Sequence, residues 1–418
     1  MYPAKSLLTL PKAILLCCAM LIAATSTSQA QLLPPDLPQH DFINYSSNVL
    51  HYDTASPQMK RLFQKWRETT SSGGTLHIVH IGGSHVQAGA LSNTIRTRIL
   101  AAWPNHTGDR GMIFPYSAAA KCNNPADYRI HCREKMLLTR CVYHEHDYPL
   151  GACGIAVTAA DTLTEIQVLL ADTTIDYRTS RIIVIGHSEQ EVVPTLSVDG
   201  REVFPSYVDR RTDRFVYNLT QTVDSFAIHI PCQPSQQFTL TGIYLGNRQD
   251  GISFSSLGVN GAAVGDFLRC RHLVRDLRLM RPDVVLFGIG INDAVPPDFD
   301  TAAFRQNYLS LVDSIRAASP DCTFIFITNN DSYRKTGRRK YSVNRNGLLA
   351  REVFYRLAHD TGGAVWDQFE VMGGLRSMDR WRQAGLARTD RVHFTAAGYR
   401  LLGHLFCNAL FNALQSSE

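Results

Sequence analysis

The chain carries little charge for its length. Its 418 residues include 19% Asp, Glu, Lys and Arg, and the net charge is only +5. With 44% hydrophobic residues, this composition excludes a disordered, highly charged protein and provides enough apolar material for a core. The small positive charge also argues against a nucleic-acid partner. A chain of this length is expected to form two domains, or one domain with a large insertion, because single cores stop growing at about 250–300 residues.

Long hydrophobic runs are missing after residue 30. No stretch there approaches the roughly 20 consecutive apolar residues of a membrane span. The one apolar run, Ala13–Ala24, follows Lys5 and Lys12 and precedes the small residues Ser28 and Ala30. This order is typical of a secretory signal peptide. We therefore expect residues 1–30 to be removed near Ala30, and the mature chain to be periplasmic or secreted without a membrane span.

Cysteine pairs with the spacing of a structural zinc site are also missing, because no two cysteines are separated by two to four residues. The HEHD segment (residues 144–147) has no recognisable zinc pattern either, so no metal or cofactor is expected. The mature chain keeps eight cysteines, an even number that permits disulfides without assigning them. Four of them lie between residues 122 and 153, where a cross-linked loop region is expected. Cys322 and Cys407 lie in apolar patterns typical of buried thiols.

The two ends of the chain alternate between strand and helix patterns. Residues 31–55 are an extended lead-in, and Ser56-Pro57 marks a helix start. Residues 76–81 form a predicted strand that ends at a Gly-rich turn, and a helical pattern follows over residues 91–100. Further predicted elements are strands 283–287, 322–328 and 364–366 and helices 304–315, 348–358 and 395–414. This alternation predicts an α/β fold with a parallel sheet covered on both faces.

The middle of the chain is different. Short β-rich segments separated by turn signals lie at residues 181–185, 193–198, 214–217 and 225–230. They predict an all-β insertion, a sandwich or jelly roll, at residues 119–248. The α/β domain would then consist of a first part, residues 56–118, and a second part, residues 249–418.

Two Gly-containing motifs are candidates for chemistry. Ser84 ends the motif Gly82-Gly83-Ser84 at the carboxyl end of a predicted strand, where doubly wound sheets bind ligands. A serine on such a turn can act as a nucleophile and can offer its own backbone N–H to a carbonyl oxygen. The alternative is a serine that caps the next helix. Gly258, in the segment SLGVNGA (residues 256–262), can bring a backbone N–H close to a substrate or simply form a turn.

Two further motifs contain polar side chains at element ends. Asn292 follows the predicted strand 283–287, and its amide can donate to an oxyanion or cap a helix. Asp390 and His393 precede the last predicted helix. At this spacing the carboxylate can accept from the imidazole Nδ1–H and leave Nε2 free as a base. The alternative is a pair of surface residues beside a helix start.

The order of these four motifs along the chain resembles that of the SGNH hydrolases, also called GDSL esterases. The resemblance implies a flavodoxin-like, three-layer α/β/α fold and no cofactor. It implies that Ser84 is the nucleophile, that Asp390 and His393 complete a triad, and that Ser84, Gly258 and Asn292 form the oxyanion hole. One position departs from the family pattern: Gly83 stands where the family has an aspartate that braces the nucleophile turn.

A β-rich insertion and a histidine directly after the serine make the chain similar to peptidoglycan O-acetylesterases. This narrower resemblance implies an exported serine esterase that removes O-acetyl groups from a polysaccharide, with peptidoglycan as the first choice. An acetyl esterase for plant or host glycans and an O-acetyltransferase are alternatives with the same residues. A non-catalytic glycan-binding protein is the alternative of another class. The sequence does not determine the oligomeric state.

A basic cluster follows the predicted strand 322–328. It consists of Arg334, Lys335, Arg338, Arg339 and Lys340. It either meets an anionic glycan beside the active site or forms a solvated loop.

Overall fold

The structure is a computed structural model. It describes residues 38–417 except residues 120–121, 123–124, 145–148, 160–162, 171–174, 248 and 339. The predicted signal peptide, residues 145–147 of the HEHD segment and Arg339 therefore lie outside the described residues. Among the described residues, no helix is both long and apolar enough to cross a membrane.

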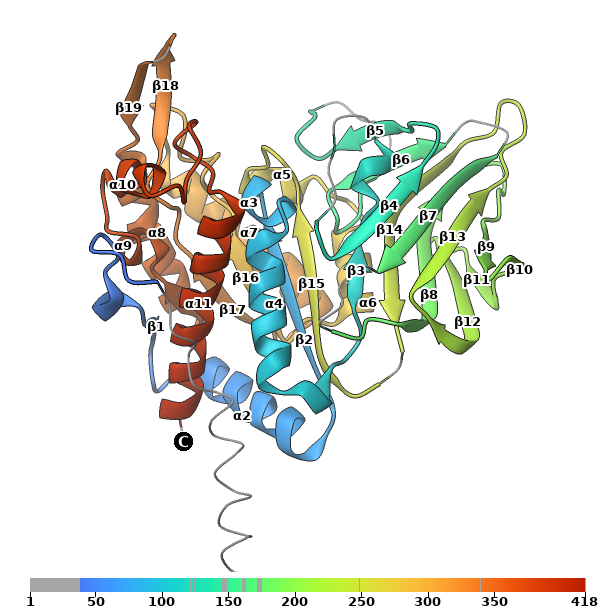
Figure 1. Cartoon of the computed structure of the whole chain (residues 1–418), viewed down its shortest axis with the longest axis horizontal. Coiled ribbons are helices and arrows are strands. Elements are labelled where there is room, and N and C mark those ends of the chain that lie inside the picture. Colours follow the sequence, from blue (N-terminus) through green and yellow to red (C-terminus); the bar gives the residue numbers. More distant parts are fainter. Residues whose placement is uncertain are drawn as a thin grey trace, which may run out of the picture.

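A six-stranded sheet forms the centre of the α/β domain (Figure 1). Its strands, in spatial order, are β1 (Leu50–Tyr52), β20 (Ala364–Trp366), β17 (Thr323–Ile327), β16 (Val284–Gly288), β2 (Thr75–Gly82) and β15 (Gly251–Gly258). All neighbouring pairs are parallel except β1 with β20. The inner strands are almost entirely buried, as expected for a sheet with helices on both faces.

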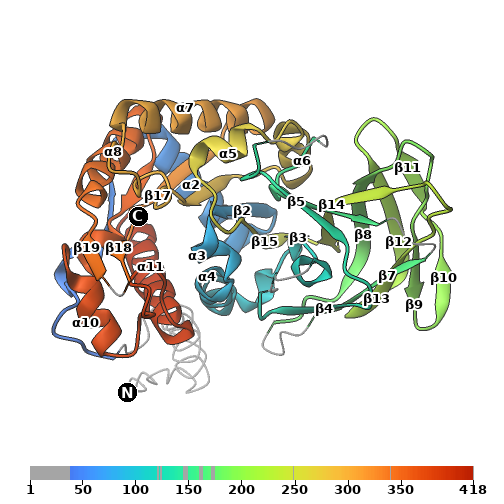
Figure 2. The ribbon, with the colours of Figure 1, turned by 90° about the horizontal axis from the view of Figure 1, so that it is seen from above.

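Helices cover both faces of this sheet (Figure 2). The helix α4 (Ala90–Ala102) packs against α11 (Ala396–Ser416), while α7 (Thr301–Ala318) packs against α5 (Val264–Leu268), α6 (Leu273–Met280) and α8 (Asn346–Thr361). The helix α2 (Pro57–Ser72) begins with the predicted cap, since Ser56 Oγ accepts a hydrogen bond from the Met59 N–H. The short helices are η1 (Tyr45–Ser47), α3 (Ser84–Gln87), η2 (Pro104–His106), η3 (Tyr116–Ala118), α9 (Gln368–Val371) and α10 (Ser377–Gln383).

The β-rich middle of the chain forms two antiparallel sheets. One has the order β10 (Arg201–Val203), β9 (Thr195–Val198), β13 (Ser225–Ile230), β7 (Thr164–Leu170) and β4 (Tyr128–Cys132). The other has the order β11 (Tyr207–Asp209), β12 (Arg214–Val223), β8 (Thr179–His187), β14 (Phe238–Gly246), β6 (Ile155–Ala159) and β5 (Leu137–Arg140), with β3 (Gly111–Ile113) also paired to β14. The predicted fold class, a parallel α/β sheet with an inserted all-β part, is confirmed.

The β-rich part and the α/β part share contacts at their junction. The Tyr116 hydroxyl donates to the carbonyl of Gly258, over 2.8 Å, and the Ala152 N–H donates to Asp276 on α6, over 3.0 Å. The strand β3 precedes the predicted start of the insertion, yet it pairs with β14. The exact boundaries of the insertion stay a prediction.

The eight described cysteines are all free thiols, so the structure contains no cross-link between residues 122 and 153. Seven of them are buried and Cys122 is partly buried. Cys322 and Cys407 are buried as the apolar patterns predicted. Burial raises the pKa of Cys407 to about 12, which makes its thiol unreactive.

Candidate active site

Ser84 lies at the carboxyl end of β2, where the strand turns into α3. Gly82 is required for this turn, because a Cβ atom there would lie 2.1 Å from a Val86 methyl group and 2.7 Å from the Gly288 carbonyl oxygen. The close approach of β2, α3 and β16 thus depends on the absence of a side chain. Ser84 is the first residue of α3, so its backbone N–H has no acceptor within the helix.

Ser84, His393 and Asp390 form one hydrogen-bonded chain. Ser84 Oγ lies 2.7 Å from His393 Nε2, and His393 Nδ1 lies 2.9 Å from Asp390 Oδ2. The second carboxylate oxygen of Asp390 accepts from the backbone N–H groups of Val392 and His393, each over 2.9 Å. The carboxylate therefore holds both the imidazole and the loop that carries it. Nδ1 is oriented as a donor, which leaves Nε2 to accept the serine proton.

The environment keeps Asp390 ionised. Burial alone would raise its pKa, but the hydrogen bonds from the His393 side chain and from the His393 and Val392 backbone lower the pKa well below its ordinary value. The His393–Asp390 pair remains accessible to solvent, since the side chains of His393 and Asp390 are 33% and 47% exposed. An open site of this kind can admit part of a polymer without enclosing it.

Asn292 lies in the turn after β16, beside the Ser84 turn. Its Nδ2 donates one hydrogen bond to the Ala262 carbonyl, over 2.9 Å. An amide nitrogen has two N–H bonds, so one is left to donate to a substrate. The neighbouring Asp293 accepts from the Val264 N–H with both oxygens, over 3.2 Å, and burial raises its pKa to about 6. The turns after β15 and β16 are thus fixed to each other.

Gly258, the predicted third donor of the oxyanion hole, ends β15 against α3. A Cβ atom there would lie 2.2 Å from the Gln87 backbone nitrogen. The absence of a side chain is therefore required for the packing of α3 on β15. The role of its N–H as an oxyanion donor stays a prediction.

Gly83, which replaces the aspartate of the family pattern, has no steric need to be glycine. Its φ is −90°, a value open to any residue. A Cβ atom there would lie 3.5 Å from Asn292 Nδ2 and 3.5 Å from the Ala262 carbonyl oxygen. An aspartate at this position would thus face the Asn292 amide and the loop after β15, and in this chain the Asn292–Ala262 hydrogen bond joins these two directly.

No motif of the sequence indicated a role for His85 or for its partner Tyr399. The His85 ring lies 5.1 Å from the His393 ring at an interplanar angle of 31°, and His85 Nδ1 lies 2.8 Å from the Tyr399 hydroxyl. Burial, together with the nearby His393, lowers the pKa of His85 to about 3. His85 is therefore a neutral ring that packs against the imidazole of the triad. Only its position directly after Ser84 was visible in the sequence.

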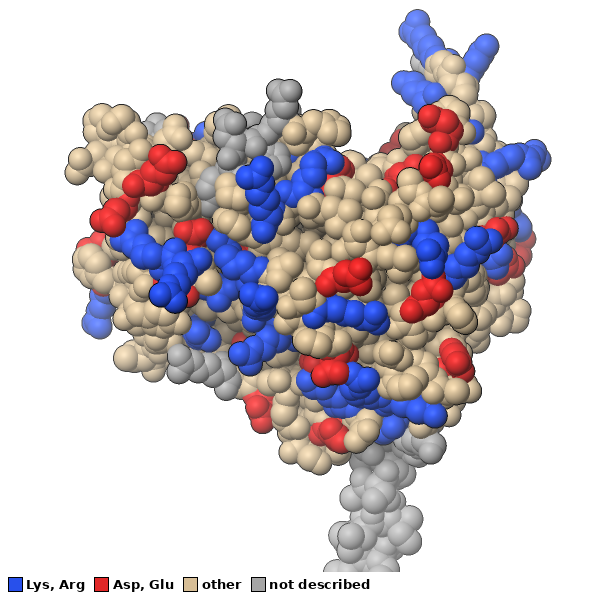
Figure 3. All heavy atoms as spheres, turned by 180° about the vertical axis from the view of Figure 1, so that it is seen from behind, with Lys and Arg blue, Asp and Glu red and all other residues tan. Residues whose placement is uncertain are grey.

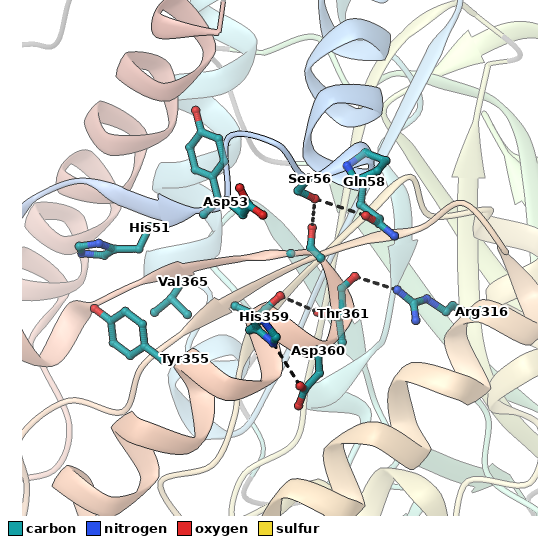
Figure 4. A pocket seen from close by; sticks show the side chains of 15 residues that line it. His51, Asp53, Ser56, Gln58, Arg316, Tyr355, His359, Asp360, Thr361 and Val365 are labelled. Atoms are coloured by element: carbon teal, nitrogen blue, oxygen red, sulfur yellow. Dashed lines mark hydrogen bonds and ion pairs between the residues drawn. The ribbon is translucent and has the colours of Figure 1, made fainter.

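The triad does not line the cavity shown in Figure 4. That cavity, of about 590 Å³, lies between β1, the start of α2 and the end of α8. Its polar groups largely bond to one another: Ser56 Oγ donates to the Gly362 carbonyl, over 2.6 Å, and Arg316 donates to the Thr361 carbonyl, over 3.0 Å (Figure 4). These bonds join α2 and α7 to the end of α8.

A parallel α/β/α sheet with a serine, a histidine and an aspartate in one hydrogen-bonded chain at its carboxyl edge defines the class of serine hydrolases. Residues 236–401 match the model of the GDSL-like Lipase/Acylhydrolase family, which confirms the resemblance inferred from the four motifs. The match includes Asn292, Asp390 and His393, whereas Ser84 lies before the β-rich part and outside the matched range. The matched part of the chain is therefore similar to the carboxylic ester hydrolases of that family.

The solved structures that resemble the chain have low sequence identity to it. A peptidoglycan O-acetylesterase superposes with a TM-score of 0.69 over 90% of this chain and 99% of its own, at 22% identity. The lipase/acylhydrolase from Enterococcus faecalis covers 39% of this chain and 77% of its own, at 22% identity and a TM-score of 0.31. The acetyl xylan esterase AlAXEase covers 37% and 78%, at 18% identity and a TM-score of 0.29. No curated protein matches the chain.

Proposed function

We propose that the protein is an exported O-acetylesterase that acts on peptidoglycan, with Ser84 as nucleophile, His393 as base and Asp390 as the group that orients it. The observation that carries this proposal is the hydrogen-bonded chain from Ser84 Oγ through His393 to Asp390. The choice of substrate is supported by the match to a peptidoglycan O-acetylesterase over 90% of the chain, β-rich part included. Export is supported by the signal-peptide pattern of residues 1–30.

The first half of the reaction forms an acetyl-enzyme. Ser84 Oγ attacks the acetyl carbonyl carbon while its proton moves to His393 Nε2. The negative charge on the carbonyl oxygen is stabilised by N–H donors, for which Ser84, Gly258 and Asn292 are the candidates. The bond to the sugar oxygen then breaks, and His393 returns the proton to that oxygen. The products are a free sugar hydroxyl and an acetyl ester on Ser84.

The second half restores the enzyme. His393 Nε2 takes a proton from water, and the hydroxide oxygen attacks the acetyl-enzyme carbonyl. When the tetrahedral intermediate collapses, the bond to Ser84 Oγ breaks and His393 returns its proton to the serine. Acetate is released. Asp390 stays ionised in both halves and stabilises the imidazolium that forms in each of them.

Acetate release from O-acetylated peptidoglycan tests the proposal, with acetylated xylan as the comparison polymer. We expect release from peptidoglycan by the mature protein and loss of release, by a factor of about 10⁴ or more, in the Ser84→Ala variant. Release from xylan alone would contradict the assignment of peptidoglycan as the substrate, while the assignment of Ser84 as the nucleophile would stand. No release from either, together with no labelling by a fluorophosphonate probe, would contradict the esterase proposal itself.

A further inference from the structure

The basic cluster of the sequence lies on a two-stranded hairpin that projects from the α/β domain (Figure 1). Its strands are β18 (Tyr333–Gly337) and β19 (Lys340–Val343), which pair only with each other. An isolated two-stranded hairpin is at best marginally stable in water. The base of this hairpin must therefore be held by the rest of the protein.

One side of the base is bound to the loop that carries the triad histidine. The Tyr333 N–H donates to the Arg391 carbonyl, over 3.1 Å, and Asn330 Nδ2 donates to the Val392 carbonyl, over 3.0 Å. Arg391 and Val392 are two residues of the segment that joins Asp390 to His393. The Arg391 guanidinium also lies 5.0 Å from the centres of two hairpin rings, those of Tyr333 and Tyr341. The hairpin and the triad loop form one packed unit.

The other side of the base is bound to the loop that carries Asn292. Asn344 follows β19 directly, and its Nδ2 donates to the Ala294 carbonyl, over 3.0 Å. Ala294 is two residues beyond Asn292. The base of the hairpin is thus attached to the two loops that carry Asn292 and His393, so its position is fixed relative to these residues.

The outer part of the hairpin is positively charged and has no acidic neighbour along its sequence. Residues 333–343 (YRKTGRRKYSV) contain no Asp or Glu, and Figure 3 shows the basic side chains at the projecting tip. Within the described residues, no ion pair or hydrogen bond involves the side chains of Arg334, Lys335, Arg338 or Lys340. No acidic side chain of the described residues compensates these charges. A cluster of uncompensated positive charge attracts anionic groups, which favours an external anionic partner.

We propose that the hairpin binds carboxylate groups of the polymer whose acetyl ester is at Ser84, namely those on its peptide stems. We take the partner to be a polymer that carries carboxylates, because each guanidinium or ammonium group on the exposed hairpin can form an ion pair with one carboxylate. Peptidoglycan carries carboxylates on its peptide stems, whereas an acetylated neutral xylan carries none on its backbone. This inference rests on the proposed function and specifies which part of the substrate is recognised outside the triad.

The experiment compares two variants that each lose four positive charges. The hairpin variant is Arg334→Gln, Lys335→Gln, Arg338→Gln and Lys340→Gln. The control variant is Lys60→Gln, Arg271→Gln, Arg278→Gln and Arg356→Gln, four exposed residues on α2, α6 and α8 or beside them. The substrates are soluble O-acetylated peptidoglycan fragments and the same fragments with their carboxylates converted to amides.

We expect the KM of the hairpin variant for the carboxylate fragments to rise roughly tenfold, because the loss of each of the four exposed ion pairs weakens binding by a factor of about 1.8. Its kcat should stay within about twofold. The amidated fragments should abolish the difference between variant and wild type, and the control variant should behave as wild type with both substrates. An unchanged KM for the carboxylate fragments, or an equal rise with the amidated ones, would overturn the inference.

A binding measurement separates this inference from the proposed function. The Ser84→Ala variant, with and without the four hairpin substitutions, is tested for binding to the carboxylate fragments by equilibrium dialysis. A roughly tenfold weaker Kd with the hairpin substitutions supports the inference even if the wild type releases no acetate, in which case the proposed activity alone fails. Equal Kd values with and without the hairpin substitutions overturn the inference whatever the activity.

Discussion

Gly82 and Gly83 stand side by side before Ser84, but only one of them has to be glycine. Gly82 is closed in by Val86 and by the Gly288 carbonyl. Gly83 has a negative φ, and a Cβ atom there would meet its neighbours at ordinary van der Waals distance. The departure from the family aspartate is therefore a difference in local hydrogen bonding, with no change required in the path of the backbone.

Gly83→Asp is expected to fold and to raise the free energy of unfolding by a few tenths of a kcal/mol, because Gly83 is the N-cap of α3 and aspartate is a better cap than glycine. Gly82→Ala should lower the same quantity by about 2 kcal/mol or more, since its methyl group has no space. Urea denaturation of both variants checks this. A loss of more than about 1 kcal/mol in Gly83→Asp would show that glycine is needed at this position after all.

Asp331 is a buried carboxylate beneath the basic hairpin. One of its oxygens accepts from the Met378 N–H, over 3.0 Å, and the other has no hydrogen-bond partner within the described part of the chain. Burial, together with the nearby Asp379, raises its pKa from 3.8 to about 6. Ionisation of Asp331 is therefore less favourable in the folded protein than in the unfolded chain.

Asp331→Asn should raise the free energy of unfolding by about 3 kcal/mol at pH 8. A raised carboxyl pKa means that the folded wild type binds more protons than the unfolded chain between about pH 4 and pH 6, so wild-type stability increases as the pH falls through this window. The advantage of the variant should therefore disappear by about pH 4. Urea titrations at several pH values measure this, and an advantage independent of pH would contradict the assignment.

At the scale of elements, a buried charge cluster connects α4 to the first strands of the β-rich part. Arg96 of α4 and Arg110, just before β3, both donate to Asp127 Oδ2, just before β4. All three side chains are at most 1% exposed. Burial opposes ionisation of Asp127, but the two guanidinium groups lower its pKa to about 2. One carboxylate thus compensates two buried cations.

Removal of the Asp127 carboxylate should strongly destabilise the folded protein. Asp127→Asn is expected to cost about 3–5 kcal/mol of unfolding free energy, because two guanidinium groups would remain buried without a counter-ion. Asp176→Asn is the matched control. It breaks an exposed pair with Arg178 and should cost less than about 1 kcal/mol. Similar values for the two variants in chemical denaturation would rule out a stabilising role for the cluster.

At the scale of the whole molecule, the four tryptophans Trp66, Trp103, Trp366 and Trp381 all lie outside the β-rich residues 119–248. Tryptophan fluorescence therefore reports on the α/β part, while far-UV circular dichroism also reports on the antiparallel sheets. The two parts share the β3–β14 pairing and the Tyr116–Gly258 hydrogen bond.

Because of these shared contacts, we expect the two signals to give coincident urea transitions, as in a single cooperative unit. Urea midpoints that differ by more than about 0.5 M would show that the β-rich part unfolds independently. The Asp127→Asn variant provides a further check, since its loss of stability should move both transitions together.

The sequence alone determined most of the local structure. Continuous apolar runs predicted β2, β16, β17 and β20, because strands buried on both faces contain few polar residues. Helical periodicity and the Ser56-Pro57 cap predicted α2, α7, α8 and α11. The strands β1 and β15 were not predicted, since β1 has only three residues and β15 contains three serines in eight residues. Their strand conformation depends on pairing with β20 and β2, and this pairing is not local.

The tertiary structure alone decided which polar groups meet. The motifs indicated Ser84 and His393 separately, but their hydrogen bond joins residues 309 positions apart. Ser84 follows β2 and His393 precedes α11, and only the folded chain brings these two segments together. The packing of His85 against His393 and the sharing of Asp127 by two arginines have no sequence signal, because both depend on the arrangement of elements that are distant in the chain. The same reason holds for the basic hairpin: its composition is visible in the sequence, whereas its attachment between the Asn292 and His393 loops is a property of the fold.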